Sequence, residues 1–288
     1  IIDQGVFKQV ALLQGYSQND IDIWWGIYTG KFKLLINVPI SIASAMAASF
    51  VPVLTGSYAR KDMEDVRKQI NLSTRFVMVV AFPCTVGLAV LATPIFNLLF
   101  NGTRQTNNVA SYMMWIGAVS VLFYAMSTLS NGLLQGIDRL KVPVINAAIA
   151  LGAHVIVLVA LMLFFRLNIY AVVLANAFFA LLMCFLNSSA LKKYSGFEQE
   201  VRKTFIIPAI CSIFMGIAAF LIYFLLDHAL TMIGGRMRNA IAFVIAFVIA
   251  VIVYAITLLL FKGLSEDEIR KFPKGTTIIR FAKKFHLL

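Results

Sequence analysis

The sequence has long stretches without charge. Seven apolar segments of 22 to 28 residues contain no Asp, Glu, Lys or Arg: residues 34–59, 76–100, 109–136, 142–165, 170–191, 204–226 and 240–261. About 20 helical residues suffice to cross the hydrocarbon core of a bilayer. Helices of a soluble domain carry charge on the face turned to water, so this absence excludes a soluble globular fold. The sequence predicts an all-α polytopic membrane protein.

Cysteine and acidic residues are scarce as well. The three cysteines lie singly inside predicted spans, and all thirteen Asp and Glu residues lie outside them. Without a CxxC pair or a Cys/His cluster, neither a disulfide framework nor a metal site is indicated. We predict no catalytic residue, no metal and no cofactor. His154 has no acid in the spans to pair with and is predicted to form an ordinary interhelical hydrogen bond.

Basic residues are concentrated in alternate loops. Residues 58–71, 137–141, 192–203 and the segment after residue 261 contain 17 Lys and Arg, whereas the opposite loops contain four. The positive-inside rule places the basic loops and the C-terminus in the cytoplasm. The net charge of +12 is therefore interpreted as a topology signal. It does not predict a nucleic-acid partner, because no folded basic domain accompanies it.

Both ends of the chain differ from the spans. Residues 1–14 read as the end of a further helix, too short to cross the membrane, and the chain starts at Ile. We therefore expect a part of a longer transporter, whose N-terminal lobe is a missing partner. Residues 265–288 place Ile278 and Phe281 on one helical face beside Arg280 and Lys283. This pattern predicts a basic amphipathic tail on anionic inner-leaflet lipids.

Lysines near the membrane are the candidate binding residues. An ionisable side chain at membrane depth is costly and is a functional hypothesis by default. Lys31 and Lys33 follow Trp24 by seven and nine residues, which places them roughly 10–14 Å along a helix from the outer surface. Lys8 lies at a comparable depth, and three ammonium groups near one depth would attract an anion. The alternative is that these lysines reach up to the lipid headgroups.

Helical spacing adds two polar side chains to this set. Asn37 follows Lys33 by four residues, so the two share a helical face, which we take as the preferred binding face. Lys31 is two residues from Lys33 and points elsewhere. Gln135 and Asn131 form a second pair of this kind near the predicted cytoplasmic end of their helix. Arg75 is predicted to be an end residue that reaches the headgroups.

Several segments resemble one transporter family. Residues 30–39 (GKFKLLINVP) and 47–52 (AASFVP) are similar to the eighth helix of the MOP-superfamily polysaccharide exporters. The branch resembled contains the stage V sporulation protein B and the MurJ-like lipid II flippases of Firmicutes. Residues 133–139 (LLQGIDR), followed by Pro143, resemble the end of helix ten of that family. Residues 264–268 (LSEDE) resemble part of its C-terminus.

The resemblance implies a fourteen-helix, MATE-like transporter with two lobes. This chain would supply part of helix seven and helices eight to fourteen. Residues 1–191 would form the second lobe, 192–264 the final helix pair with a groove for a lipid tail, and 265–288 the cytoplasmic tail. The implied substrate is an undecaprenyl-pyrophosphate-linked sugar, such as lipid II or a polysaccharide precursor. It would be flipped across the bacterial cytoplasmic membrane by alternating access, with Lys31 and Lys33 in a cavity for the diphosphate.

Three other functions stay open. A multidrug and toxin antiporter of the same superfamily would call for a carboxylate within the membrane, and the seven spans contain none. A membrane transferase acting on a lipid-linked sugar would need an acid, His or Cys grouping at the interface. A scaffold without transport activity is the third.

Overall fold

The computed structural model is all-α and describes residues 2–232, 234–263 and 280. The predicted basic tail thus lies outside the described residues, apart from Arg280. The elements in chain order are α1 (Ile2–Leu13), α2 (Gln18–Ile27), η1 (Tyr28–Phe32), α3 (Lys33–Ala59), α4 (Met63–Val90), α5 (Ala92–Leu99), α6 (Arg104–Gly117), α7 (Ser120–Gly136), α8 (Lys141–Leu163), α9 (Ile169–Ser195), η2 (Arg202–Ile206), α10 (Ile207–Ala229) and α11 (Gly235–Leu260).

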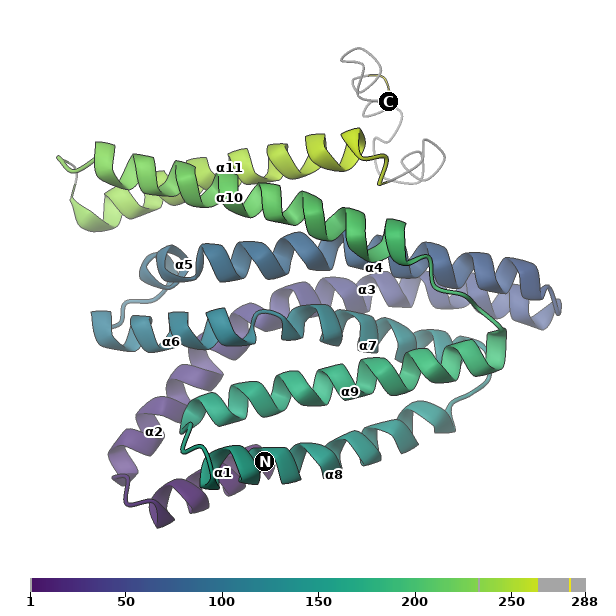
Figure 1. The fold of residues 1–288 in the computed structure, drawn as a ribbon, viewed down its shortest axis with the longest axis horizontal. Coiled ribbons are helices and arrows are strands. Elements are labelled where there is room, and N and C mark those ends of the chain that lie inside the picture. Colours follow the sequence, from purple (N-terminus) through teal and green to yellow (C-terminus); the bar gives the residue numbers. More distant parts are fainter. Residues whose placement is uncertain (1, 233, 264–279, 281–288) are drawn as a thin grey trace.

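The number of spans agrees with the prediction. Six helices are long and apolar enough to cross a membrane, and the bent pair α6 and α7, which meets at 56°, makes a seventh if it is one span. One span runs without interruption from Gln18 to Ala59, through α2, η1 and α3. Figure 1 shows α2 at a steep angle to the C-terminal part of α3. The predicted helical segment at residues 1–14 is confirmed as α1.

One predicted boundary is wrong. The loop expected at residues 58–71 is mostly helix, because α4 already begins at Met63. The Asp62 carboxylate accepts a hydrogen bond from the Asp65 backbone N–H at 3.0 Å, which satisfies a free donor of the first turn. Glu64 and Asp65 also complement the helix dipole there. A charge-free window marks the part of a helix that suits lipid, and this helix continues beyond that part.

The connections between helices gather at two opposite ends of the molecule. The α3–α4, α7–α8 and α9–α10 connections lie at the right in Figure 1, and the α5–α6, α8–α9 and α10–α11 connections lie at the left. The first set holds the basic segments 58–71, 137–141 and 192–203, so the structure places these three at one end. We call this end the basic end and the other the opposite end; which of them faces the cytoplasm is a prediction.

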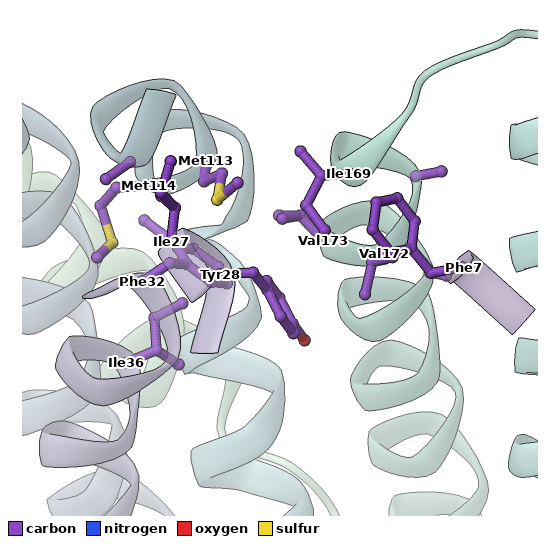
Figure 2. Close-up of a cluster of buried hydrophobic side chains, with 14 of the residues drawn as sticks. Phe7, Ile27, Tyr28, Phe32, Ile36, Met113, Met114, Ile169, Val172 and Val173 are labelled. Atoms are coloured by element: carbon purple, nitrogen blue, oxygen red, sulfur yellow. The ribbon is translucent and has the colours of Figure 1, made fainter. Parts of the chain in front are cut away.

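The helices pack in layers. Within the bundle α1–α9, α3 packs on α4 and α7, α7 on α9, and α9 on α8, while α10 and α11 pack on each other and α10 on α4 (Figure 1). Gly117 lets helices approach closely: a Cβ there would meet the Phe32 ring at 2.5 Å and Val173 at 2.6 Å. Phe32 and Val173 belong to a buried cluster that joins α1, η1, α6 and α9, shown in Figure 2.

Candidate functional site

A single turn of π-helix positions both candidate lysines of the long span. The turn η1 is inserted between α2 and α3, and Lys33 is the first residue after it. Single π-turns inside α-helices often occur at functional sites. Tyr28 and Phe32 of η1 are buried, and their rings stack with centroids 5.6 Å apart. The buried rings anchor the turn, while Lys31 and Lys33 point to different surroundings.

Lys31 is held by neutral oxygens at the opposite end of the molecule. Its Nζ donates to Asn107 Oδ1 at 2.7 Å and to Thr106 Oγ1 at 3.1 Å. Asn107 in turn donates to Asn97 Oδ1 at 3.1 Å. The space is tight, since a Cβ on Gly102 would lie 2.5 Å from the Lys31 Nζ. Because these acceptors carry no formal charge, the ammonium group is positioned without being neutralised by them.

Lys33 lies on a different, exposed face of the same helix. Lys33 and Asn37 are both exposed, as the shared helical face predicts. The Lys33 Nζ lies 5.9 Å from the centroid of the Tyr28 ring. The same stripe continues along α3 through the exposed residues Ser41 and Ser44. We call Lys33, Asn37, Ser41 and Ser44 the α3 polar stripe. Polar groups in a membrane helix face a water-filled cavity or another part of the protein.

Gln135 lies on a groove between α3 and α7 near the basic end. The groove has a volume of about 380 Å³ and is lined by Ser44, Ala47, Ala48, Val51, Pro52, Thr128, Asn131, Gly132 and Gln135. Gly132 allows close approach here, since a Cβ on it would meet Val51 at 3.1 Å. Ser44 follows Lys33 by eleven residues, which is about 16 Å along a helix. Gln135 and Lys33 therefore belong to one surface without forming one compact cluster.

Lys8 has an acidic partner. Its Nζ lies 2.6 Å from Asp22 Oδ1, which joins α1 to α2. Asp22 also accepts a hydrogen bond from Gln18 at 3.0 Å. The charge of Lys8 is thus balanced locally, unlike that of Lys31. Of the three predicted lysines, the structure leaves Lys31 and Lys33 as the stronger candidates for an anion.

Two intramembrane polar residues differ from the sequence prediction. Arg75, predicted to reach the headgroups, is only 7% exposed and forms an ion pair with Glu200, just before η2. His154, predicted to have no acid partner, lies with its Nε2 2.6 Å from Asp3 Oδ1. Asp3 belongs to α1, which lies outside the seven predicted spans but packs against α8 and α9. A carboxylate therefore does lie among the membrane helices.

Sequence reasoning missed this Asp3–His154 pair because the two residues are 151 positions apart. Asn176 joins the pair by donating to Asp3 Oδ2 at 3.0 Å. The only available signal was the rarity of such residues, since His154 is the one histidine in the seven spans. Periodicity shows which face of a helix is polar, but not which distant helix supplies the partner. Among the described residues, no group of three or more His, Cys, Asp or Glu residues could hold a metal ion.

An apolar groove lies between the bundle and the final helices. It has a volume of about 490 Å³ and lies between α4, α6 and α10, with Val86, Ala89, Val90, Trp115, Ile213, Gly216, Ile217, Phe220 and Leu221 along it. A Cβ on Gly216 would lie 2.6 Å from Val86 Cγ1, so α10 approaches α4 closely at this point. The lining residues suit an acyl or isoprenoid chain and offer few polar groups.

Comparison with known proteins gives a consistent result. The family described as "Lipid II flippase MurJ" matches residues 33–233. The lipid II flippase MurJ of Bacillus subtilis (strain 168) is 23% identical over 255 residues, which cover 88% of this chain and 46% of the relative. A probable lipid II flippase MurJ of Bdellovibrio bacteriovorus is 28% identical over 165 residues, covering 56% of this chain and 31% of the relative. The uncharacterized membrane protein YabM of Bacillus subtilis (strain 168) is 24% identical over 261 residues, which cover 90% of this chain and 47% of the relative.

The fold is also similar to a solved structure. A lipid II flippase MurJ in an inward closed conformation superposes with a TM-score of 0.68 at 19% identity, over 91% of this chain and 50% of that one. At this identity the likeness shows the fold alone. The chain spans about half the length of the two Bacillus subtilis relatives. By its family match, this multi-span membrane chain belongs to the lipid II flippase MurJ family, a family of transporters and not of enzymes.

Proposed function

We propose that the protein containing this chain flips an undecaprenyl-pyrophosphate-linked sugar across the cytoplasmic membrane, with lipid II as the first candidate. The observation that carries the proposal is the α3 polar stripe, which starts at Lys33 on an otherwise apolar helix. A polar face of this length is costly against lipid, so it suits the wall of an aqueous cavity. The other wall would come from the N-terminal lobe of the same protein.

The positive charge of the stripe suits the diphosphate of such a substrate. Two unit charges 4 Å apart attract each other by about 4 kcal/mol at an effective dielectric constant of 20. Lys33 would supply this attraction from the exposed face, and Lys31 would add a positive field from its neutral amide and hydroxyl cradle. Asn37 and Gln135 would offer hydrogen bonds further along the cavity. Lys8 is the weakest member of the set, because Asp22 balances its charge.

The apolar groove at α10 would hold part of the lipid chain. Its position between α4, α6 and α10 separates the lipid from the polar stripe on α3. A carrier that moves a headgroup through a polar cavity needs such a separate apolar path for the tail. The basic end would face the cytoplasm, which follows from the charge bias of the loops.

The test uses the full-length protein in a strain that lacks its lipid II flippase. Lys33→Glu should abolish growth rescue while membrane levels stay normal, and Lys33→Arg should retain part of it, since Arg keeps the charge and its donors match phosphate. Lys31→Ala should be less damaging than Lys33→Ala. Lys192 is an exposed lysine at the basic end. Lys192→Glu is therefore the matched control and should rescue fully. Full rescue by Lys33→Glu would refute the cationic cavity.

A second candidate is a cation-coupled antiporter for small toxic molecules. The partly buried Asp3 favours it, because such exporters use a carboxylate within the membrane. The two candidates separate in one experiment with the full-length protein. An antiporter would lower the accumulation of cationic dyes and fail to rescue the flippase-deficient strain. A flippase would rescue that strain and leave dye accumulation unchanged.

A further inference from the structure

The Asp3–His154 pair joins three helices in the interior of the bundle. His154 of α8 is 2% exposed, and the Asp3 side chain of α1 is 22% exposed. The His154 Nε2 lies 2.6 Å from Asp3 Oδ1, and the Nδ1 lies 2.9 Å from the backbone oxygen of Ala175 in α9. His154 precedes the end of α8 by nine residues, about 13 Å along the helix. The pair is therefore well inside the span.

The hydrogen bonds of His154 require an extra proton. A backbone carbonyl can only accept, so the Nδ1 must carry a hydrogen. A neutral imidazole then has a lone pair on Nε2, and this lone pair would face a carboxylate oxygen at 2.6 Å. Two acceptors do not lie that close without a proton between them. The geometry thus describes a protonated imidazole beside a carboxylate, or a neutral imidazole beside a carboxylic acid.

The groups around the pair also favour one proton shared between Asp3 and His154. Asn176 donates to Asp3 Oδ2 and to the backbone oxygen of Val172, both at 3.0 Å, and accepts from the Tyr124 hydroxyl at 3.2 Å. Lys33 attracts the Asp3 carboxylate, while Tyr28 and Tyr124 are neutral groups near it. With the proton, the pair has no net charge. Without it, the pair has one negative charge and two lone pairs in contact, which is costly at membrane depth.

We propose that Asp3 and His154 form a proton-binding site, and that release of the proton to water loosens the packing of α1 on α8 and α9. Proton binding by the pair is independent of the proposed function; its use to drive translocation would rest on that function. The site would couple the position of α1 to the pH of whichever side of the membrane it opens to. Lys33 would sense the change, because its charge interacts with the Asp3 carboxylate.

The first measurement is nitrogen NMR of the full-length protein in nanodiscs with 15N-labelled histidine. The His154 signals, assigned by their loss in His154→Gln, should change between pH 6 and pH 9 from a form with protons at both nitrogens, or a proton shared at Nε2, to an Nδ1–H form. Asp3→Asn should abolish this change, since an amide can itself donate to Nε2. His228→Gln is the matched control, because His228 also has its Nδ1 2.9 Å from a backbone oxygen but is exposed; it should leave the His154 signals unchanged.

The second measurement is thermal unfolding of the same samples. The melting temperature of the parent should exceed that of His154→Gln by more at pH 6 than at pH 9, because the bridging proton is lost as the pH rises. His154 signals that stay the same from pH 6 to pH 9 in the parent would overturn the proton site. A His154 signal that responds to sodium in place of pH would overturn it in favour of a metal-cation site. An equal melting difference at both pH values would overturn the loosening of α1. None of these readouts requires substrate transport, so failure of the Lys33 experiment leaves them interpretable.

Discussion

The bundle α1–α9 and the pair α10–α11 place their polar groups differently. In the bundle, amides connect helices in the interior: Asn146 donates to Asn187 at 2.9 Å, and Asn187 donates to Asn131 at 2.7 Å. In the pair, side chains bond to backbone oxygens of α4 and α5, as Tyr254 does to Val79 at 2.6 Å and Asn239 to Pro94 at 3.0 Å. Elsewhere both helices of the pair expose large apolar side chains.

This difference separates two tasks. Interior amide bonds between three helices specify one arrangement of the bundle, because each amide left without its partner would cost free energy. The pair α10–α11 is attached to α4 and α5 and exposes many large apolar side chains, which suits a lipid-facing element that can shift on the bundle. The apolar groove lies at the boundary between these two regions.

The largest effect should come from crowding the bundle at Gly117. A Cβ there would lie 2.5 Å from Phe32, so Gly117→Leu must push apart α6, η1 and α9. We expect a loss of about 3 kcal/mol or more, seen as loss of folded protein in detergent. Gly152→Leu on α8, where a Cβ meets nothing within 4 Å, should be tolerated. Equal tolerance at both glycines would contradict the close packing.

The next largest effect should come from breaking the amide chain of the bundle. Asn187 is fully buried, so Asn187→Leu leaves Asn131 and Asn146 without their partner. We expect a cost of about 1–3 kcal/mol, measured as a lower melting temperature of the full-length protein. Ser189→Leu, an exposed position on the same helix, is the control. An unchanged melting temperature for Asn187→Leu would show that the amide chain does not stabilise the bundle.

A smaller, local effect is expected in the pair. A Cβ on Gly216 would lie 2.6 Å from Val86 Cγ1 of α4. The side chain of Gly216→Leu should therefore push α10 away from the bundle. Because α10 packs on the bundle mainly through α4 and leaves its outer face exposed, we expect only about 1–2 kcal/mol with the bundle still folded. A cysteine at Val86 in a Cys-free background should become more reactive to a thiol reagent. If Gly216→Leu instead unfolds the protein as Gly117→Leu does, the two regions are not separable.

The smallest perturbation tests the orientation of both regions. Leu140 at the basic end and Met232 at the opposite end are both exposed, so a cysteine at either should leave stability unchanged. In intact cells, Met232→Cys should react with an impermeant thiol reagent and Leu140→Cys should not. Permeabilised cells provide the control, in which both should react. Labelling of Leu140→Cys alone in intact cells would reverse the predicted topology.

Much of the fold could be predicted because lipid imposes strict rules on sequence. Lipid excludes charge, so charge-free windows located the seven spans, and the spacing of Lys33 and Asn37 placed them on one exposed face. The start of α4 at Met63 was not predicted, because a helix that extends into water carries charge like any loop. Arg75 was misjudged since its partner Glu200 is 125 positions away.

The sequence by itself determined the class of the protein, its span count and the polar face of α3, since these depend on local composition and helical period. Only the tertiary structure decided which charges are balanced. Lys8 meets Asp22, Lys31 meets neutral oxygens and Asp3 meets His154. The physical reason is that an ionisable group in a membrane responds to the atoms within a few ångströms of it. Those atoms come from helices whose neighbours no single span specifies.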